Sequence, residues 1–584
     1  MEKRTLLAVV LSVLVITGFW VVQGIFFPPP EPPPATEQSP VSGVPVVPGD
    51  GQPSLSGPSQ ESPELIAVEE PVPEQTVAIN TPLLTVLLSN AGGDITSFKL
   101  KDHQDGNDQV EMILSGNQEA HAFTVAFGPM NVQPVRSRFY VNRLSEYSVE
   151  FYRDFTMPEG GTFRLTKRYD FKPNEYMFEL TLTLDGGHSV SAFNFSGVAY
   201  TLGFGPQIGP KFEKLDQYEY RNYYTFTNGK QKQEKASENP IVNHPSWAAI
   251  AGKYFAFIAI PYANQYELIF SAKPEPGLAS ASRLYLTRPG VNGRTEDTYR
   301  FYLGPKNQAN LGMYNTGNNA FNLRDMELIK VANTSGILTP LENLLKWILT
   351  LFYRIAPNYG IAIIFLTLLV KILLFPLTKK SSESTLRMQT LAPKIKEIQE
   401  KYKDNPQKMQ MEVAEFYKKE GYNPLAGCLP LLLQFPIFIA MYNLFNNHFD
   451  LRGAMFIPGW IPDLSLPESV FNFSPVRLPL LGWSDIRLLP FIYVGSQLLF
   501  GKVTQTPDQQ GNAQMKMMFY AMPIIFFFVL YNVPSGLLLY WIMSNILSLG
   551  QQIIINKYIA QKRAGMIPVP KEPVIAPPKK KKKR

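Results

Sequence analysis

Hydrophobic residues form long runs near both ends of this chain, and between those runs they alternate with polar residues. The first run, Thr5–Phe27, has 23 residues and follows Lys3 and Arg4. A helix of this length can span a bilayer core of roughly 30 Å, and no small-residue cleavage site follows it. No further Lys or Arg occurs before Lys99. Because positive charge is retained in the cytoplasm, the pattern predicts an uncleaved signal-anchor helix over residues 1–27.

A proline-rich stretch and then a β pattern follow. Residues 28–76 bury little and are expected to form an extended periplasmic linker. Residues 77–335 contain short segments of alternating or continuous apolar residues, separated by Gly, Pro and Asn turns. The clearest examples are Thr162–Tyr169, Tyr176–Leu184 and Tyr254–Ile260. The spacing predicts one large β-sandwich domain. Its aromatic residues are expected in the core, with a sugar-binding groove as the alternative.

The C-terminal half shows helical periodicity. Residues 336–357 carry apolar positions at helical spacing and predict an amphipathic helix in the membrane interface. Five apolar spans follow and form an expected helical core over residues 358–560. They are Tyr359–Leu377, Leu429–Phe445, Leu488–Gly501, 517–533 and 535–555, the last two separated by Pro534-Ser535-Gly536. With the signal anchor, the chain is predicted to have six transmembrane α-helices.

The segment between the first two of these spans predicts a cytoplasmic helical hairpin over residues 379–427. Apolar residues recur there in steps of three and four, as in a coiled-coil seam, at Met388, Leu391, Ile395, Ile398 and Tyr402. Asp404-Asn405-Pro406 ends that helix, and Met409, Val413 and Phe416 continue the pattern on a second one.

Charge sets the expected orientation. Residues 378–427 carry ten Lys or Arg, whereas residues 446–487 carry only Arg452, Arg477 and Arg487. The positive-inside rule therefore places both termini in the cytoplasm and the large β domain in the periplasm of a multi-pass inner-membrane protein.

Lys371 is the most informative single residue, because it lies near the middle of the span Tyr359–Leu377. A charge at the centre of a lone helix costs about 3 kcal/mol, so such residues normally face protein or water. Snorkelling to the cytoplasmic end is the alternative. No Asp or Glu occurs in any span, but polar residues do: Thr367, Gln434, Ser496, Gln497, Ser544, Asn545, Gln551 and Gln552. The pattern predicts a hydrated cavity with one positive charge that attracts acidic groups.

Two spans are short. Only 14 residues separate Arg487 from Lys502, and only 15 separate Lys516 from Asn532. Helices of this length reach less than the roughly 30 Å of hydrocarbon, so the bilayer is expected to thin around them, with ordinary mismatch as the alternative.

The remaining composition argues against a soluble enzyme. The five histidines are widely spaced, no phosphate-binding glycine motif occurs, and Cys428 is the single cysteine. No metal or cofactor is expected.

Several ordered motifs strengthen this interpretation. They are Leu345-Lys346-Trp347-Ile348, Lys371 followed by Phe375-Pro376-Leu377-Thr378-Lys379, Asn423-Pro424-Leu425-Ala426-Gly427-Cys428-Leu429-Pro430, Gln434-Phe435-Pro436-Ile437-Phe438, and Pro534-Ser535-Gly536-Leu537 with Leu539-Tyr540-Trp541 and Ser544-Asn545. With these motifs the chain resembles the YidC/Oxa family of membrane insertases in its Gram-negative form. The similarity is most specific over about 341–560.

The resemblance implies a five-helix core around a hydrophilic groove that opens to the cytoplasm and to lipid. It also implies a periplasmic β-supersandwich, similar to sugar-mutarotase folds but not an enzyme. Bacterial relatives usually carry arginine where this sequence has Lys371, so the charge is kept while the bidentate geometry is lost. The substrate groove is expected to include Lys371, Thr367, Gln434, Tyr540, Trp541 and Asn545.

The expected function is insertion and folding of inner-membrane proteins, alone or with the Sec translocon, which the resemblance implies as a partner. The basic tail, residues 561–584, ends in Lys579, Lys580, Lys581, Lys582, Lys583 and Arg584. It predicts contact with ribosomal RNA or anionic lipid, or acts only as a topology signal. The alternatives are a small-solute transporter with Lys371 as its anion site, and a sugar-binding envelope protein anchored by its first span.

Overall fold

A computed structural model describes most of the chain outside its two ends. The described residues are 66–67, 72–115, 121–130, 132–157, 160–212, 215, 219–261, 266–275, 278–332, 338–403, 405–421, 429–474, 476–478, 483–504, 520 and 522–566. The predicted signal anchor, most of the linker, the motif from Asn423 to Cys428, the start of the fifth span and the basic end of the tail lie outside them. The chain divides into two compact units, Met1–Thr334 and Ser335–Arg584.

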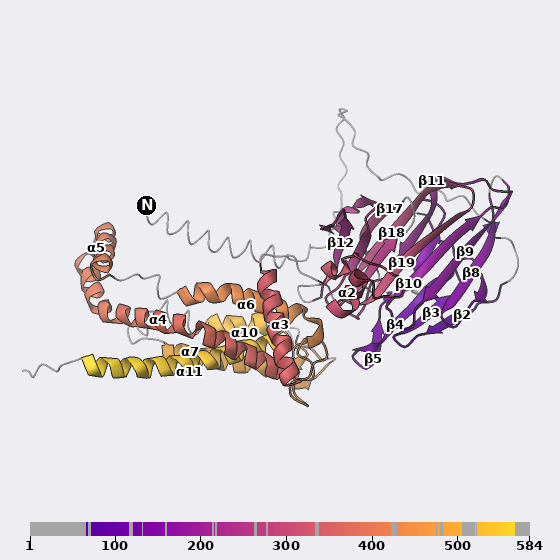
Figure 1. Ribbon diagram of the computed structural model, residues 1–584. Coiled ribbons are helices and arrows are strands. Elements are labelled where there is room, and N and C mark those ends of the chain that lie inside the picture. Colours follow the sequence, from indigo (N-terminus) through magenta and orange to yellow (C-terminus); the bar gives the residue numbers. More distant parts are fainter. Residues whose placement is uncertain are drawn as a thin grey trace, which may run out of the picture. The chain divides into compact units, whose positions relative to one another are not determined.

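The first unit consists mainly of antiparallel strands arranged in two sheets (Figure 1). The strands of one sheet are β1 (Ile66–Ala67), β7 (Tyr140–Arg143), β8 (Ser148–Thr156), β9 (Thr162–Phe171), β10 (Met177–Asp185), β12 (Asn222–Thr227), β13 (Lys230–Glu234), β15 (Trp247–Ala251), β16 (Phe255–Pro261) and β19 (Thr295–Pro305). Those of the other are β2 (Thr76–Asn80), β3 (Leu84–Ser89), β4 (Asp94–Asp105), β5 (Asp108–Glu111), β6 (Ala122–Ala126), β11 (Ala192–Phe204), β14 (Ile241–Asn243), β17 (Glu267–Glu275) and β18 (Leu278–Asn292). The short helices of this unit are η1 (Ala236–Glu238), α2 (Gln308–Thr316) and η2 (Leu328–Val331).

Strand order combines local hairpins with distant pairings. The first sheet runs β1-β8-β9-β10-β19-β16-β15-β12-β13, with β7 paired to β8. The second runs β14-β17-β18-β11-β6-β4-β3-β2, with β5 paired to β4. β10 and β19 are neighbours although more than a hundred residues separate them, and in their register Thr181 lies opposite Thr298.

The alternating segments of the sequence form the expected strands. In β9 every second residue is buried, from Phe163 to Phe171, as the pleat of a half-buried strand requires. β16 is an interior strand of its sheet and is buried on both faces from Phe255 to Ile260, as its continuous apolar run predicts. Both strand predictions are confirmed.

Aromatic side chains fill the space between the two sheets. Phe123 of β6 lies 4.6 Å, between ring centroids, from Phe301 of β19 and 5.3 Å from Phe178 of β10. Phe204 of β11 stacks on Phe257 of β16 at 4.0 Å. These rings are buried, so they form the core of the sandwich.

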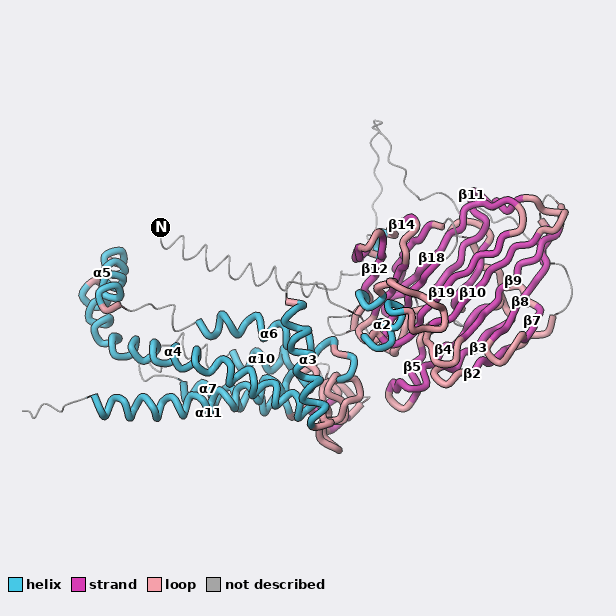
Figure 2. Tube along the Cα trace, in the orientation of Figure 1, coloured by secondary structure: helices cyan, strands magenta, loops and turns pink. Residues whose placement is uncertain are grey.

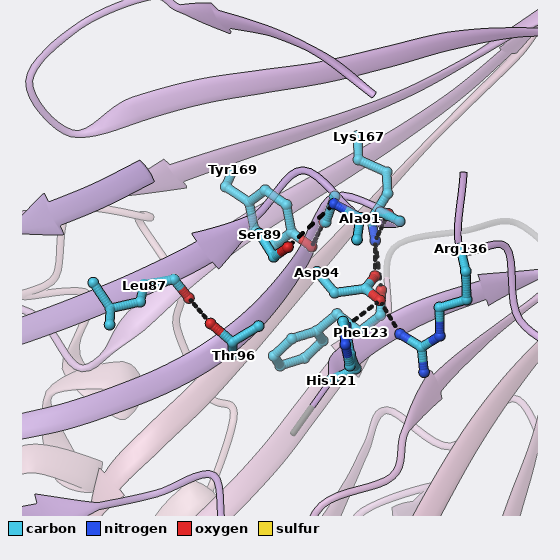
Figure 3. A network of polar contacts seen from close by, with 12 residues as sticks. Leu87, Ser89, Ala91, Asp94, Thr96, His121, Phe123, Arg136, Lys167 and Tyr169 are labelled. Carbon is cyan, nitrogen blue, oxygen red and sulfur yellow. Dashed lines mark hydrogen bonds and ion pairs between the residues drawn. The ribbon is translucent and has the colours of Figure 1, made fainter. Parts of the chain in front are cut away.

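A buried polar network also joins the sheets (Figure 3). Lys167 of β9 donates through Nζ to Asp94 Oδ1 at 2.7 Å and to the backbone oxygens of Gly92 and Phe123 at 2.9 and 2.8 Å. The second oxygen of Asp94 accepts from Arg136 at 2.8 Å and lies 3.2 Å from His121 Nδ1. Burial by itself raises the pKa of Asp94, but Lys167, His121 and Arg136 outweigh it and hold the pKa below its usual value.

The second unit is mainly helical, as Figure 2 shows. Its elements are α3 (Thr339–Ile355), α4 (Tyr359–Lys401), α5 (Pro406–Lys419), α6 (Leu429–Asn447), η4 (Phe449–Leu451), β20 (Phe471–Asn472), β21 (Asp485–Ile486), α7 (Leu489–Thr504), α10 (Met522–Leu530) and α11 (Ser535–Met566). α11 packs along both α4 and α7, and α3 packs against α4 and α6.

The helices agree with the predicted ones, with changed ends. α4 has 43 residues and continues without a break from the predicted span into the first arm of the predicted hairpin. α11 begins at Ser535, as predicted, but extends to Met566, into the region expected to be the tail. Among the described residues, Tyr359–Ser382 and Ser535–Tyr558 are long and apolar enough to cross a membrane, and Leu489–Val503 is a shorter apolar helix.

The segment between α6 and α7, residues 448–488, folds against one end of the helical bundle. The backbone N–H of Gly536, in the first turn of α11, donates to the oxygen of Leu464 at 2.9 Å. Glu468 is buried and accepts from the backbone N–H of Leu489, the first residue of α7, at 2.7 Å. A carboxylate at a helix N-terminus is stabilising. α7 and α11 therefore begin at the same end of the bundle, held by this segment.

Candidate functional site

Lys371 lies in the interior of the helical unit, on α4. It is only 8% exposed, and its Nζ donates to the Oγ of Ser548, on α11, at 2.7 Å. One residue pair thus crosses from α4 to α11. A second link lies beside it, where Gln551 Nε2 of α11 donates to the backbone oxygen of Lys371 at 3.0 Å.

The charge on Lys371 has no carboxylate partner among the described residues. None of the ion pairs within 4.0 Å there includes it, in agreement with the absence of Asp and Glu from the spans. A lysine ammonium has three N–H donors, and the described contacts use one of them. The site therefore holds a cation whose hydrogen-bonding capacity is only partly used.

Thr367 lies one turn before Lys371 but its hydroxyl is not directed to the same partner. It is almost fully buried, and its Oγ1 donates to the backbone oxygen of Ile363 at 2.7 Å. Hydroxyls in helices commonly bond back to the carbonyl four residues earlier. In this arrangement the Thr367 hydroxyl is used within α4, so Thr367 contributes to packing rather than to hydrogen bonding with another group.

Asn545, Ser548 and Gln551 form a polar stripe on one side of α11, and Asn545 lies nearest to the start of that helix. Asn545 Nδ2 donates to Ser496 Oγ of α7 at 3.0 Å, and Ser496 Oγ donates to the backbone oxygen of Tyr493 at 2.7 Å. Asn545 and Ser548 are three residues apart, so they occupy neighbouring positions on one side of α11. Through them α11 forms polar contacts with α7 and α4.

Two aromatic residues of α11 connect the stripe to α6. Trp541 stacks on Phe438 with ring centroids 5.3 Å apart and planes at 8°, and it lies 5.9 Å from Tyr493 of α7. Tyr540 is buried against Phe445 at 5.8 Å. The indole Nε1–H of Trp541 is buried and has no acceptor in the described part of the chain. A buried donor without an acceptor is costly, so this N–H is available to donate to a polar group of a ligand.

Gln434 is half-buried on α6, one turn before Phe438. No described residue forms a hydrogen bond with its side chain. Gln434, Phe438, Met441 and Phe445 follow helical spacing, which places the amide on the side of α6 that meets Tyr540 and Trp541.

Five of the six predicted groove residues thus fall into two groups, and Thr367 stands apart. Lys371 and Asn545 belong to the polar contacts of α11, and Gln434, Tyr540 and Trp541 gather where α6 meets α11, while Thr367 bonds within its own helix. Ser548, the partner of Lys371, is not among the residues that the sequence predicts for the groove. The sequence feature that points to Ser548 is its position three residues after Asn545 and three before Gln551, on the same polar stripe.

Among the described residues, two helices long and apolar enough to cross a membrane are joined in one chain to a separate β-sandwich. This combination is typical of a membrane protein that carries a folded domain outside the bilayer. Residues 351–562 match the family described as 60Kd inner membrane protein, and residues 76–330 match the family described as YidC periplasmic domain.

Full-length relatives agree with both matches. A membrane protein insertase YidC from Treponema denticola is 45% identical, covering 95% of this chain and 99% of that protein. A second, from Treponema pallidum, is 38% identical over 95% of this chain and 99% of its own length. The chain therefore belongs to the YidC family of membrane protein insertases, and the resemblance found in its motifs is confirmed.

A solved structure described as an active YidC insertase with its first transmembrane domain resolved is also similar to this chain. It is 17% identical, the similarity covers 84% of this chain and 94% of that one, and the TM-score is 0.36.

Proposed function

We propose that this insertase passes polar segments of its substrates through a site between α4 and α11 that is centred on Lys371. The partly used ammonium of Lys371 supports the proposal most directly, because its one described partner is a neutral hydroxyl. A carboxylate on a substrate would form a charge-assisted hydrogen bond there, roughly twice as strong as the neutral bond to Ser548. The substrate would therefore displace Ser548 rather than compete with a built-in anion.

The rest of the path follows from the polar and aromatic residues on α6, α7 and α11. A translocated polar tail would exchange hydrogen bonds with Asn545, Gln434 and the indole N–H of Trp541 while it crosses. The apolar segment would then leave between the third and fifth spans into lipid. Burial of apolar surface, at roughly 25 cal/mol per Å², drives that last step.

Short helices reduce the distance to be crossed. α7 has 16 residues, about 24 Å at the α-helical rise, against a hydrocarbon core of roughly 30 Å. A bilayer that thins around α7 lowers the cost of carrying a polar segment past it.

The proposed topology has six transmembrane helices, both termini in the cytoplasm and residues 77–335 in the periplasm. The α4–α5 hairpin would meet nascent inner-membrane proteins on the cytoplasmic side. Association with the Sec translocon, and contact of the tail ending at Lys579–Arg584 with ribosomes, are part of the proposal. No catalytic residue, cofactor or metal is assigned.

The test is insertion of a purified single-span substrate into liposomes that contain only this protein, scored by protease protection of the translocated tail. Two substrates are compared, one with an acidic tail and one with its Asp and Glu changed to Asn and Gln. Lys371→Gln should lower insertion of the acidic substrate roughly tenfold, as expected for the loss of one hydrogen bond to a charged group. The neutral substrate should change much less.

Lys502→Gln is the matched control, because Lys502 lies in the last turn of α7 and is exposed. It should leave both substrates unaffected. Equal insertion of the acidic substrate by the native protein and by Lys371→Gln would refute the electrostatic role of Lys371.

A further inference from the structure

The segment between α6 and α7 exposes large apolar side chains although it lies outside the helices. In its second half, residues 470–488, six of them are each between 42% and 64% exposed: Val470, Phe471, Val476, Leu478, Ile486 and Leu488. We use the name 470–488 hairpin for the described residues of this part, which are 470–474, 476–478 and 483–488. Phe471 of β20 and Ile486 of β21 are direct cross-strand partners, so their side chains lie on one face. Exposed large apolar side chains that gather in one short segment are typical of a site of interaction.

Two charged side chains of the hairpin, Asp485 and Arg487, form hydrogen bonds with neighbouring residues. The carboxylate of Asp485 accepts from Ser469 Oγ at 2.8 Å and from Asn472 Nδ2 at 2.7 Å. Arg487 donates to the backbone oxygen of Tyr531 at 2.7 Å, and its side chain is 15% exposed. Within the described part of the hairpin, Arg477 is the exposed charge. Asp485 and Arg487 are thus mostly covered and hydrogen-bonded, whereas the exposed face combines the apolar side chains with Asn472, Ser474 and Arg477.

This surface continues into the apolar sides of the helices. Trp483 stacks on Tyr531 with ring centroids 3.5 Å apart and planes at 6°, and it lies 6.0 Å from Phe528 of α10. Phe528 is 51% exposed, and Phe491, in the first turn of α7, is 54% exposed. In an inner-membrane protein such exposed apolar side chains on spans face lipid. The bilayer that covers them reaches the base of the hairpin.

We propose that the 470–488 hairpin is a lipid anchor that lies in the headgroup layer, with Phe471 and Ile486 directed into the acyl boundary. Trp and Tyr side chains are enriched at this depth, where Trp483 and Tyr531 lie in this arrangement. The segment that carries the hairpin also binds the first turns of α7 and α11, through Glu468 and Leu464. Its depth in the membrane therefore sets the depth of both helices, including the short α7.

The experiment places an environment-sensitive NBD fluorophore on single cysteines, in a background in which Cys428, the only native cysteine, is replaced by serine. The labelled variants are Phe471→Cys and Ile486→Cys in full-length protein, in nanodiscs of phosphatidylethanolamine and phosphatidylglycerol. Quenching by shallow doxyl-labelled lipid is compared with quenching by aqueous iodide. Phe491→Cys on α7 is the control for a lipid-facing site. Met411→Cys on α5, an apolar residue that is 57% exposed, is the control for a water-facing site.

Lipid quenching at Phe471 and Ile486 should approach that at Phe491, with iodide quenching several-fold below that at Met411. Iodide quenching equal to that at Met411, without lipid quenching, would overturn the proposal. Protection from both quenchers would overturn it too, because the surface would then be covered by protein, and dilution would show whether a second copy is responsible. Absence of lipid quenching at Phe491 would instead contradict the membrane placement on which the proposed function depends.

Discussion

Lys167 and Lys371 are both buried but are stabilised in different ways, and the difference indicates their roles. Lys167 uses all three donors, with the Asp94 carboxylate and two backbone oxygens as acceptors. Lys371 has one described acceptor, the neutral hydroxyl of Ser548. A paired and fully bonded cation is suited to structure, whereas a partly bonded cation keeps the capacity to bind an anion. The two residues are of the same type, so the difference between their expected roles comes from their environments.

Charge rather than shape should matter at Lys371. Lys371→Arg keeps a positive charge that can still reach Ser548 or a substrate carboxylate, although the guanidinium differs in geometry. In the liposome assay it should insert the acidic-tailed substrate within about threefold of the native rate, because the loss on removing the charge is much larger. If Lys371→Arg were as inactive as Lys371→Gln, the site would depend on the compact ammonium itself.

The Asp94 network should make the β domain sensitive to acid. The pKa of Asp94 is lowered in the folded state from an ordinary value of 3.8, so its stabilisation is present above that pH and is lost as the pH falls through the folded pKa. Asp94→Asn leaves Lys167 buried without its anion. It should lower the free energy of unfolding at neutral pH by about 3–5 kcal/mol and flatten the acid dependence below pH ~4.

The measurement is urea unfolding of the full-length protein in detergent, at neutral pH and in acid, followed by proteolytic protection of the β domain. Asp154→Asn is the control, since Asp154 forms an exposed pair with Arg164. It should change the free energy of unfolding by less than about 1 kcal/mol. Equal effects of the two substitutions would show that the buried pair contributes no more than a surface pair.

At the scale of elements, α4 shows what sequence patterns specify. Its apolar residues and the later seam from Met388 to Tyr402 predicted helix on both sides of Lys379. The change from apolar to charged residues there indicated where lipid ends, but it does not end a helix, because Lys and Ser do not interrupt backbone hydrogen bonding. The 43 residues form one helix of about 65 Å, so Lys371 and the cytoplasmic arm belong to the same element.

Close packing between α4 and the segment before the hairpin offers a second test. At Gly360 an added Cβ would lie 2.0 Å from Cδ2 of Phe456, so Gly360→Ala must displace that ring. Overpacking of this kind costs about 1–3 kcal/mol. Gly495→Ala in α7 is the matched control, since nothing lies within 4 Å of its added Cβ. It should be neutral or stabilise the helix by up to about 1 kcal/mol.

Thermal unfolding in detergent, monitored by calorimetry, distinguishes these two variants. The transition of Gly360→Ala should move to lower temperature, and that of Gly495→Ala should not. Identical transitions would mean that the segment containing Phe456 shifts without cost and does not hold the start of α4.

At the scale of the whole molecule, the sequence predicted local structure better than distant pairing. The strand β9 follows from alternation of apolar and polar residues, and the helix α6 follows from a long apolar run, and both patterns are set by neighbouring residues. The pairing of β10 with β19, and the contact of Lys371 with Ser548, join residues more than a hundred positions apart. No local pattern selects among the many possible partners at such separations. The family was recognised because motifs keep their order, which does not require the contacts to be known.

Separate cores in the two units lead to the last prediction. The chain divides at Thr334 and Ser335, and every contact described for Lys371, Asn545 and Trp541 comes from the second unit. A variant without residues 77–330 should therefore insert the single-span substrate at half the native rate or more. When Lys371→Gln is added to this deletion, the rate should fall by about one order of magnitude. Liposome insertion is the readout, and the calorimetric transition of the helical unit shows that the bundle still folds. Loss of insertion with an intact transition would assign the β domain a direct part in handling the substrate.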